Sequence, residues 1–353
     1  MGKIFLVTGG SGFIGANFIQ YLLKNDLAKK IINLDKLTYA GNPQNLLKFE
    51  HDDRYVFNQG DICDQEHVRE LIQLHHPDII VNFAAESHVD RSIDRPADFI
   101  QTNIVGTSVL LQEALQYFKK LDREKSTDFR FHHVSTDEVF GSLGEEGFFT
   151  EETPYDPSSP YSASKAASDH LVRAWHRTFG LPAIISNCSN NYGPFQFPEK
   201  LIPLMILNCL AEESLPVYGT GENVRDWLYV DDHCEAIYTI IEKGKIGETY
   251  NVGGNNEIQN IEIIITICSI LDEIQPSANG NSYSDLITYV KDRPGHDFRY
   301  AIDSSKLKDE LNWSPNETFE SGIRKTIDWY LENQVWWQDI QNNTYQQERL
   351  GVV

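Results

Sequence analysis

The sequence predicts an α/β fold in which a doubly wound parallel sheet is followed by a smaller C-terminal lobe. Short runs of β-branched residues alternate with amphipathic segments through the first half of the chain, which is the pattern of βαβ units. After about Cys188 the rhythm changes, and Pro, Asn and Gly separate shorter elements. A chain of 353 residues is long enough for one large α/β domain and a second lobe.

The strands expected in the first half are short apolar runs at Ile4–Thr8, Ile31–Asp35, Tyr55–Gln59, Ile79–Phe83, Phe131–Ser135 and Ala183–Cys188. Helical periodicity separates them at Phe13–Lys24, His67–Leu74, Asn103–Phe118 and Ser162–Phe179. Right-handed crossovers place helices on both faces of such a sheet, and ligands then bind beyond the carboxyl ends of the strands.

The second half is expected to form a lobe over one edge of the sheet. Loops are expected at Asn190–Lys200 and Pro276–Ser284, and short strands at Val217–Tyr218 and Trp227–Val230. The expected helices are Leu201–Leu210, Asp232–Glu242, Ile261–Leu271, Ser304–Leu311 and Ser321–Asn333. The expected division is a sheet domain at 1–188 with later strands returning from about 225–252, a lobe at 189–337, and a tail at 338–353.

The composition argues against several classes of function. With 52 acidic and 30 basic residues the formal charge is −22, and such a surface repels nucleic acid and anionic lipid. The five scattered cysteines form no C-x-x-C pair and the histidines show no metal-ligand spacing, so no disulfide framework and no metal site are expected. The apolar run Ile4–Val7 is too short for a signal peptide or a membrane span, and a cytoplasmic protein is expected.

A glycine-rich turn follows the first strand. Gly9, Gly12 and Gly15 are spaced G-x-x-G-x-x-G around Phe13 and Ile14, at the start of a helix. Glycine permits the tight turn and lets N–H groups at a helix N-terminus approach a pyrophosphate. The strand before the turn and the helix after it favour a dinucleotide site of the Rossmann type over a purely structural turn.

Acidic and small residues end the following strands. Asp35 ends the second strand, where a carboxylate accepts hydrogen bonds from ribose hydroxyls and repels a 2′-phosphate, so NAD is favoured over NADP. Lys36, the next residue, partly offsets that repulsion. Asp61 and Ile62 end the third strand. Phe83, Ala84 and Ala85 end the fourth, where ordinary strand-end packing competes with cofactor contact as the explanation for the two alanines.

Two further motifs carry groups for proton transfer. Tyr161 and Lys165 are four residues apart on one helical face, where an ammonium can lower the pKa of a phenol that accepts a proton from an alcohol. Thr136, Asp137 and Glu138 lie between a strand and that helix. Two adjacent carboxylates in a cleft favour one neutral acid beside one ionised base, whereas the alternative is a solvated pair at a strand end.

These three motifs together resemble the extended short-chain dehydrogenase/reductase family of nucleotide-sugar enzymes, and more specific segments resemble its 4,6-dehydratases. The resemblance runs from Lys3 to about Trp337, and its more specific segments are Ser135–Gly141, Pro157–Ala166, Asn190–Lys200, Val224–Val230 and Lys291–Asp297. Phe140 is a departure, since the family commonly has tyrosine there.

The resemblance implies a reaction on dTDP-glucose in deoxysugar (rhamnose-type) biosynthesis. Tyr161 takes the C4 hydroxyl proton while Thr136 bonds the same oxygen, and hydride passes to NAD. Glu138 then removes the C5 proton, Asp137 protonates the departing C6 hydroxyl, and hydride returns to C6. Lys165 assists Tyr161 and holds the nicotinamide ribose.

The resemblance also implies further contacts. Leu37, Thr38, Thr102 and Asn191 are added to the NAD site. The expected substrate residues are Ser87, Thr136, Asn190, Glu199, Lys200, Leu201, Pro216, Tyr218, Arg225, Asn260, Arg293 and His296. Among these, the cations suit a diphosphate on an otherwise acidic protein. Relatives pair the helices 103–118 and 162–179 with those of a partner, so a homodimer is expected.

Three alternatives stay open at this point. A 4,6-dehydratase of another nucleotide sugar is the nearest. A nucleotide-sugar 4-epimerase shares the cofactor and the Tyr/Lys pair but needs no acid pair. A catalytically silent NAD-binding scaffold is the third, although it has no reason to keep Asp137 and Glu138 together with Tyr161 and Lys165.

Overall fold

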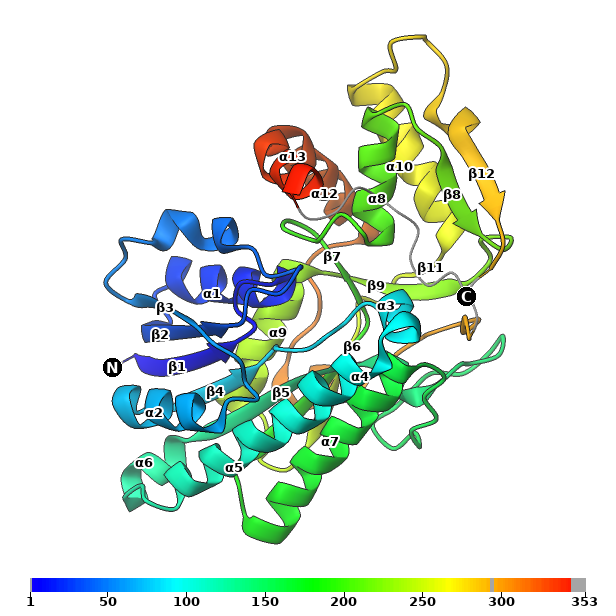
Figure 1. Cartoon of the computed structure of the whole chain (residues 1–353). Helices are drawn as coiled ribbons and strands as arrows, with labels where there is room; N and C mark the ends of the chain where they lie inside the picture. The colour runs from blue at the N-terminus through cyan, green and yellow to red at the C-terminus, as the bar shows by residue number, and fades with distance from the viewer. Residues whose placement is uncertain (1, 293–294, 344–353) are drawn as a thin grey trace.

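The computed structural model describes residues 2–292 and 295–343, and its centre is a seven-stranded parallel sheet (Figure 1). The strand order is β10-β6-β5-β4-β1-β2-β3, and every neighbouring pair is parallel. The strands are β1 (Lys3–Thr8), β2 (Ala28–Asp35), β3 (Tyr55–Gln59), β4 (Ile79–Asn82), β5 (Arg130–Thr136), β6 (Ala183–Cys188) and β10 (Thr249–Val252). The predicted doubly wound α/β class is confirmed.

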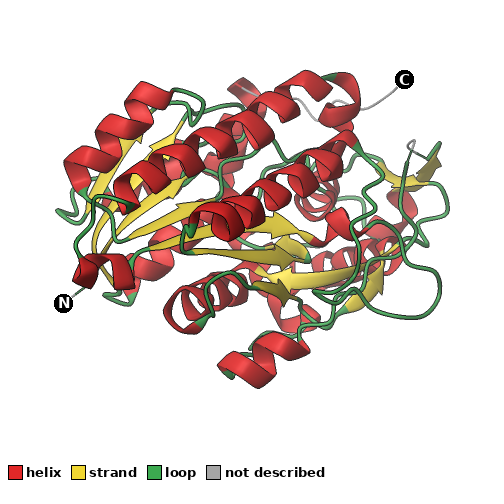
Figure 2. Ribbon diagram, turned by 90° about the horizontal axis from the view of Figure 1, so that it is seen from below, coloured by secondary structure: helices red, strands yellow, loops and turns green. Residues whose placement is uncertain are grey.

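Helices cover both faces of the sheet. Phe5 and Val7 of β1 belong to the core shared with α1 (Phe13–Lys24) and α9 (Val230–Lys243). Leu6, between them, belongs to the opposite core, because successive side chains on a strand alternate in direction. That second core is covered by α2 (Gln65–His75), α5 (Thr107–Phe118) and α7 (Pro160–Phe179), and long helices lie in front of the strands in Figure 2.

The helix expected at Asn103–Phe118 has a more complex start. α3 (Val89–Asp94), α4 (Pro96–Phe99) and a π-helical turn, η2 (Ile100–Gly106), precede α5. A short helix, α6 (Arg123–Asp128), then leads from α5 into β5. The π-helical turn packs on α7, so the segments expected to carry catalytic and dimer-forming residues lie side by side.

The second half forms a lobe with its own core, seen at the upper right of Figure 1. Tyr192, Ile206, Ile267 and Ile327 are among the side chains buried there. Its strands are β7 (Asn190–Tyr192), β9 (Val224–Tyr229) and β11 (Glu257–Gln259) in one sheet, and β8 (Leu215–Tyr218) and β12 (Ile287–Val290) in another. Its helices are α8 (Leu201–Leu210), α10 (Asn260–Ile274), η4 (Tyr283–Leu286), α12 (Phe319–Glu332) and α13 (Gln334–Asn343), while η1 (Pro43–Phe49) and α11 (Ser305–Leu311) lie on the sheet domain.

Three details differ from the expectation. Asn190–Tyr192, expected as loop, pairs with β9, because Tyr192 is fully buried against Trp227 and Phe319. Of the strands between 225 and 252, only β10 joins the large sheet. Part of the expected tail, 338–343, belongs to α13, and the rest of it lies outside the described residues. The domain boundaries themselves stay a prediction.

Candidate active site

Two adjoining cavities open at the carboxyl ends of the sheet strands. The first, called here the strand-end cavity, has a volume of about 310 Å³ and is lined by the glycine-rich turn and by Tyr161 and Lys165. The second, called the lobe cavity, has a volume of about 300 Å³ and is lined by α8, β8 and Arg225. The two cavities share a wall made of Ser87, Glu138, Asn190, Asn191, Gln196, Glu199 and Lys200.

The three positions of the first turn are occupied by glycine for different physical reasons. A Cβ on Gly9, whose φ is +70°, would lie 2.6 Å from the Ala84 nitrogen, and one on Gly15 would lie 2.3 Å from the Gly9 oxygen. A Cβ on Gly12 would meet only the Gly9 oxygen, at 3.3 Å. Gly12 begins α1 without a side-chain cap and lines the strand-end cavity, so its open side leaves room for a ligand group at the helix N-terminus.

Asp35 lies at the end of β2, where the adenosine part of the cofactor was expected to bind. Its Oδ2 accepts a hydrogen bond from the Ser11 N–H and its Oδ1 from the Leu37 N–H, both at 2.8 Å. A carboxylate oxygen has a second lone pair, so the group can still accept from a hydroxyl. Burial raises the Asp35 pKa, although the two N–H groups oppose the rise. Lys36 makes an ion pair with Asp61 at 2.7 Å.

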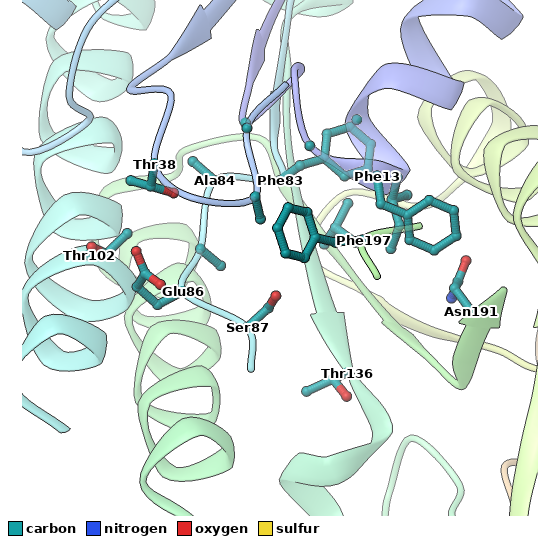
Figure 3. A pocket seen from close by; sticks show the side chains of 18 of the residues that line it. Phe13, Thr38, Phe83, Ala84, Glu86, Ser87, Thr102, Thr136, Asn191 and Phe197 are labelled. Carbon is teal, nitrogen blue, oxygen red and sulfur yellow. The ribbon is translucent and has the colours of Figure 1, made fainter. Parts of the chain in front are cut away.

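The strand-end cavity brings together nearly all of the predicted cofactor residues. The residues that line it are Gly9, Gly12, Phe13, Ile14, Gly15, Asp35, Lys36, Thr38, Asp61, Ile62, Phe83, Ala84, Ala85, Thr102, Tyr161, Lys165 and Asn191. Leu37 is not among them, because its left-handed backbone (φ 56°) turns the N–H toward Asp35. Figure 3 shows Phe13 and Asn191 on one side of this cavity, Thr38 and Thr102 on the other, and Thr136 farther down.

The acid pair begins a short helix directly after β5. Thr136 caps the 3₁₀ turn η3 (Asp137–Phe140), and its Oγ1 accepts a hydrogen bond from the Glu138 N–H at 3.2 Å. The same hydroxyl lies 3.3 Å from Asp137 Oδ1. Thr136, Asp137 and Glu138 therefore reach the cavity together.

Asp137 is almost completely buried, and its Oδ2 has no hydrogen-bond partner among the described residues. Burial raises its pKa well above the ordinary value, and the nearby charges of Glu138 and Asp226 raise it further. These effects favour the protonated form of Asp137.

Tyr161 and Lys165 lie on one face of α7. Ser159 and Ser162 form a capping box that starts the helix, with Pro160 in its first turn. The expected lowering of the Tyr161 pKa is wrong for the protein alone. Burial and the Glu138 charge raise this pKa well above its ordinary value, and only the hydrogen bond with Thr136 opposes them. Lys165 donates instead to the Val134 carbonyl at 2.9 Å.

The predicted substrate residues gather around the lobe cavity. Those that line it are Ser87, Asn190, Glu199, Lys200, Leu201, Pro216, Tyr218, Arg225, Asn260 and His296. Thr136 lines the strand-end cavity, and Arg293 lies outside the described residues. Arg225 is held rigidly, since it donates to the carbonyls of Val224 and Asp297, and its guanidinium stacks on the Tyr300 ring at 4.1 Å.

The sequence reasoning predicted Glu199 but missed the two residues that hold it, and it also missed Tyr300. Glu199 accepts from the Tyr39 hydroxyl at 2.8 Å and from Arg91 Nε at 3.1 Å, and Arg91 stacks on the Tyr39 ring. Tyr300 lines the lobe cavity and donates to Asp297 at 2.6 Å. No local signal reveals either group, because Tyr39 and Arg91 lie far from Glu199 in the sequence, and Tyr300 stacks on Arg225, which is also distant in the sequence.

Two absences apply to residues 2–292 and 295–343. Within them no cluster of three or more His, Cys, Asp or Glu residues could hold a metal ion. No helix in these ranges is long and apolar enough to cross a membrane.

A parallel sheet with a glycine turn, an acid at the end of the second strand and a tyrosine–lysine pair defines a dinucleotide-dependent enzyme of the short-chain dehydrogenase/reductase type. The sequence model described as GDP-mannose 4,6 dehydratase matches residues 6–326, and the chain belongs to that family.

Curated relatives match the chain from end to end. It is 56% identical over 360 residues to a dTDP-glucose 4,6-dehydratase of Escherichia coli, with 99% of each chain covered. It is 59% identical over 348 residues to a dTDP-glucose 4,6-dehydratase of Xanthomonas campestris pv. campestris, again with 99% of each covered.

Solved structures agree with this family. A dTDP-glucose 4,6-dehydratase of Bacillus anthracis in complex with NAD matches with a TM-score of 0.85 and 45% identity, covering 96% of this chain and 99% of that one. A UDP-glucose 4-epimerase of Thermotoga maritima matches with a TM-score of 0.82 and 27% identity, covering 94% and 99%. Dehydratases and epimerases thus share this fold, and only the site can separate them.

Proposed function

We propose that the protein is a dTDP-glucose 4,6-dehydratase, an NAD-dependent hydro-lyase that forms dTDP-4-dehydro-6-deoxy-glucose. The observation that carries the proposal is the pair Asp137 and Glu138, which lines the strand-end cavity together with Thr136 and Tyr161, while Glu138 also lines the lobe cavity. An epimerase of this fold has no use for a neutral acid next to a second carboxylate. Relatives at 56–59% identity that are dTDP-glucose 4,6-dehydratases support the assignment.

NAD is the cofactor, and the residues present fit it. The uncrowded side of Gly12 at the start of α1 suits a pyrophosphate, and the Asp35 carboxylate suits an unphosphorylated ribose. When bound, NAD would supply the hydride acceptor for C4 and the hydride donor for C6, and the positive charge of its nicotinamide would favour the phenolate form of Tyr161. The remaining steps belong to the side chains of the chain itself.

The first proton leaves the C4 hydroxyl. The Tyr161 phenolate accepts it, and the Thr136 hydroxyl donates to the same oxygen of the substrate. Lys165 adds positive charge to a site from which water is largely excluded, where its effect on a phenolate is stronger than in water. The resulting ketone makes the C5 proton acidic.

Elimination then uses the two acids in opposite roles. Ionised Glu138 removes the C5 proton, and neutral Asp137 gives its proton to the C6 hydroxyl, which leaves as water. Asp137 suits the acid role because burial keeps it protonated and leaves Oδ2 without a competing partner among the described residues. Glu138 afterwards returns a proton to C5, which completes the 4-keto-6-deoxy sugar.

The lobe cavity holds the nucleotide diphosphate in this proposal. Arg225 contributes a preorganised guanidinium and Lys200 contributes an ammonium at the shared wall. Glu199 and Asn190, also in the shared wall, lie where they can contact glucose hydroxyls. The lobe of 189–337 thus serves as the substrate-binding part and 1–188 as the cofactor-binding part.

The protein forms a homodimer through the helices 103–118 and 162–179. Val105 in the first range and Phe179 in the second are exposed by 39% and 47%, and Ile100, just before the first, by 53%. These side chains supply an apolar surface that a second copy can cover. Light scattering at several concentrations tests this, and a mass of one chain throughout would contradict it. The five free thiols support a cytoplasmic location.

One experiment separates the proposed function from its rivals. The protein is incubated with dTDP-glucose in heavy water, and product mass and stereochemistry are recorded. Loss of water with one deuterium gained at C5 is expected, because Glu138 exchanges its proton with solvent before returning it. Unchanged mass with inverted C4 would establish an epimerase, and no reaction with NAD bound would establish a scaffold. UDP-glucose and GDP-mannose in parallel reactions test the nucleotide.

A further inference from the structure

A group of buried polar residues lies behind Lys165, on the side away from the acid pair. His133 of β5 places its Nε2 atom 3.4 Å from Lys165 Nζ and 3.4 Å from Asp169 Oδ1. Asp169 lies one helical turn after Lys165 on α7 and is completely buried, as is His133. The same nitrogen lies 3.2 Å from the Ser168 hydroxyl, so the ring stands between the ammonium, that hydroxyl and a carboxylate that the reaction itself does not use.

The hydrogen bonds around His133 set its state. The Thr8 hydroxyl donates to Asn82 Oδ1 at 2.6 Å, so the Asn82 Nδ2 donates to His133 Nδ1 at 3.1 Å. His133 Nδ1 is then an acceptor, and the proton lies on Nε2, facing Asp169. Burial lowers the His133 pKa to about 4, with the Lys165 charge adding to the effect, so the ring is neutral at physiological pH.

Asp169 is ionised despite its burial. The Ser135 and Tyr155 hydroxyls and the Asn187 amide all donate to Oδ2, at 2.9, 2.8 and 3.2 Å. Oδ1 accepts no hydrogen bond among the described residues and faces the His133 ring. Burial raises the Asp169 pKa, but the neighbouring His133 ring, the Lys165 charge and the Tyr155 hydroxyl outweigh it, and the net pKa lies below the ordinary value.

We propose that Asp169 is the counter-ion of Lys165, and that its negative charge, acting across the neutral ring of His133, keeps this ammonium protonated. Asp169 is thus a positioning residue for the oxidation at C4, a role that rests on the proposed function. Removal of an ammonium from water is costly, and an isolated buried lysine loses its proton readily. Without Asp169, Lys165 would lose the charge that Tyr161 requires.

The other titratable groups around the pair do not replace Asp169. Cys188 of β6 is a neutral thiol, since burial raises its pKa, and Tyr155 is a neutral phenol for the same reason. Arg173 of α7 reaches the group through the Tyr155 hydroxyl, at 2.7 Å. On the other side are the acid pair at η3, of which Asp137 is protonated, and Tyr161. Asp169 is the ionised carboxylate on the His133 side of Lys165.

The direct test is the titration of Lys165 in the NAD-loaded enzyme. NMR of isotope-labelled lysine side chains follows its pKa, and the signal is assigned by its loss in Lys165→Met. Asp169→Asn is expected to lower the Lys165 pKa by about one unit or more, and Asp169→Glu to restore most of it. An unchanged Lys165 titration in folded Asp169→Asn would overturn the proposal.

A reciprocal measurement, on another variant, tests the proposal if the Asp169→Asn protein does not fold. Coupling between two charges is mutual, so Lys165→Met is expected to raise the pKa of Asp169, measured on isotope-labelled aspartate. An unmoved Asp169 would overturn the proposal equally. If the Asp169→Asn enzyme is active, the alkaline limb of its pH profile of kcat/KM is expected to lie at lower pH than in the parent enzyme. A lower rate with an unmoved limb would mean that Asp169 has only a packing role and would overturn the proposal. The NMR titrations remain valid even if the protein does not dehydrate dTDP-glucose.

Discussion

Asp137 and Asp169 are two completely buried aspartates at the same active site, and the structure gives them opposite charge states. Asp137 follows β5 and has one weak contact, to the Thr136 hydroxyl, with other carboxylates nearby. Asp169 lies on α7 and receives three hydrogen bonds at one oxygen, with Lys165 and His133 opposite the other. The first has a raised pKa and the second a lowered one.

The comparison shows that burial alone does not decide the state of a carboxyl group. Burial raises both pKa values, and the difference comes from the donors and charges that each side chain meets. The enzyme thereby keeps a proton ready on Asp137 and a fixed negative charge on Asp169. The proposed reaction uses both properties, since Asp137 would give a proton away and Asp169 would hold a cation.

The largest expected effect is on the acid pair. Glu138→Gln and Asp137→Asn are each expected to reduce turnover by about 10²–10⁴-fold, because proton transfer by a positioned group contributes that much. The C4 ketone should still form, since Tyr161 and Thr136 remain. Rapid quench with mass analysis of the sugar measures it. Turnover close to that of the parent protein in both variants would refute the assigned roles.

The second prediction concerns stability and has opposite signs for the two aspartates. A carboxyl group whose pKa is lowered on folding stabilises the folded protein above the ordinary pKa of 3.8, and this contribution is lost as pH falls through the folded pKa. Asp169→Asn should therefore reduce the free energy of unfolding by about 3–5 kcal/mol at neutral pH, because it leaves Lys165 without its counter-ion. Asp137, whose pKa is raised on folding, behaves in the opposite way: its stabilising contribution is present below pH 3.8 and is lost as pH rises through the folded pKa. Asp137→Asn should therefore raise the free energy of unfolding by about 1 kcal/mol or more at neutral pH.

Urea unfolding of both variants between pH 4 and pH 8, about the range in which the two groups differ, measures these changes. The gain of Asp137→Asn over the parent protein should grow as pH rises. The loss in Asp169→Asn should shrink toward acid pH. Changes of the same sign in the two variants would contradict the assigned charge states.

The contrast also separates what the sequence could predict from what it could not. The glycine turn, Asp35 and the Tyr161/Lys165 pair are local patterns next to predicted strands and helices, and the strand-end cavity unites them. The acid pair is equally local. Asp169 lies in the same helix as Lys165, yet its charge depends on Ser135, Asn187 and His133, which come from other strands.

The expectation for Tyr161 failed for the same reason. Four-residue spacing places Lys165 on the correct face of the helix but does not fix where the ammonium points. The Val134 carbonyl accepts a hydrogen bond from it on the β5 side, while the Glu138 charge acts on the phenol from η3. These contacts arise only when the strands and helices pack together, and a residue spacing does not encode them.

A third prediction tests Arg225, whose charge lowers the Asp137 pKa and which should also hold the diphosphate. Arg225→Ala is expected to weaken substrate binding by about 10–100-fold, the size of a lost charge-assisted hydrogen bond. Arg225→Lys should fall in between, because it keeps charge and loses the planar fork. Calorimetric titration with dTDP-glucose measures both. Arg324→Lys, on the exposed face of α12, is the control, and unchanged affinity in Arg225→Ala would refute the placement.

The smallest expected effect concerns Glu199, a third buried carboxylate, which is held by Arg91 and Tyr39. Tyr39→Phe keeps the ring that stacks on Arg91 and removes only the hydroxyl donated to Glu199. The loss of one hydrogen bond of this kind costs about 0.5–1.5 kcal/mol, so KM for dTDP-glucose should rise about two- to tenfold with little change in kcat.

Tyr250→Phe is the control, because it removes a tyrosine–glutamate hydrogen bond, to Glu310, together with the bond that the hydroxyl accepts from the Lys245 N–H, on a strand that lines neither cavity. Its KM should stay at the parent value while its stability falls by a similar amount. If Tyr39→Phe and Tyr250→Phe changed KM equally, Glu199 would have no special part in holding the sugar. A rise confined to Tyr39→Phe would show that the loop after Asp35, which serves the cofactor, also orients a side chain of the substrate wall.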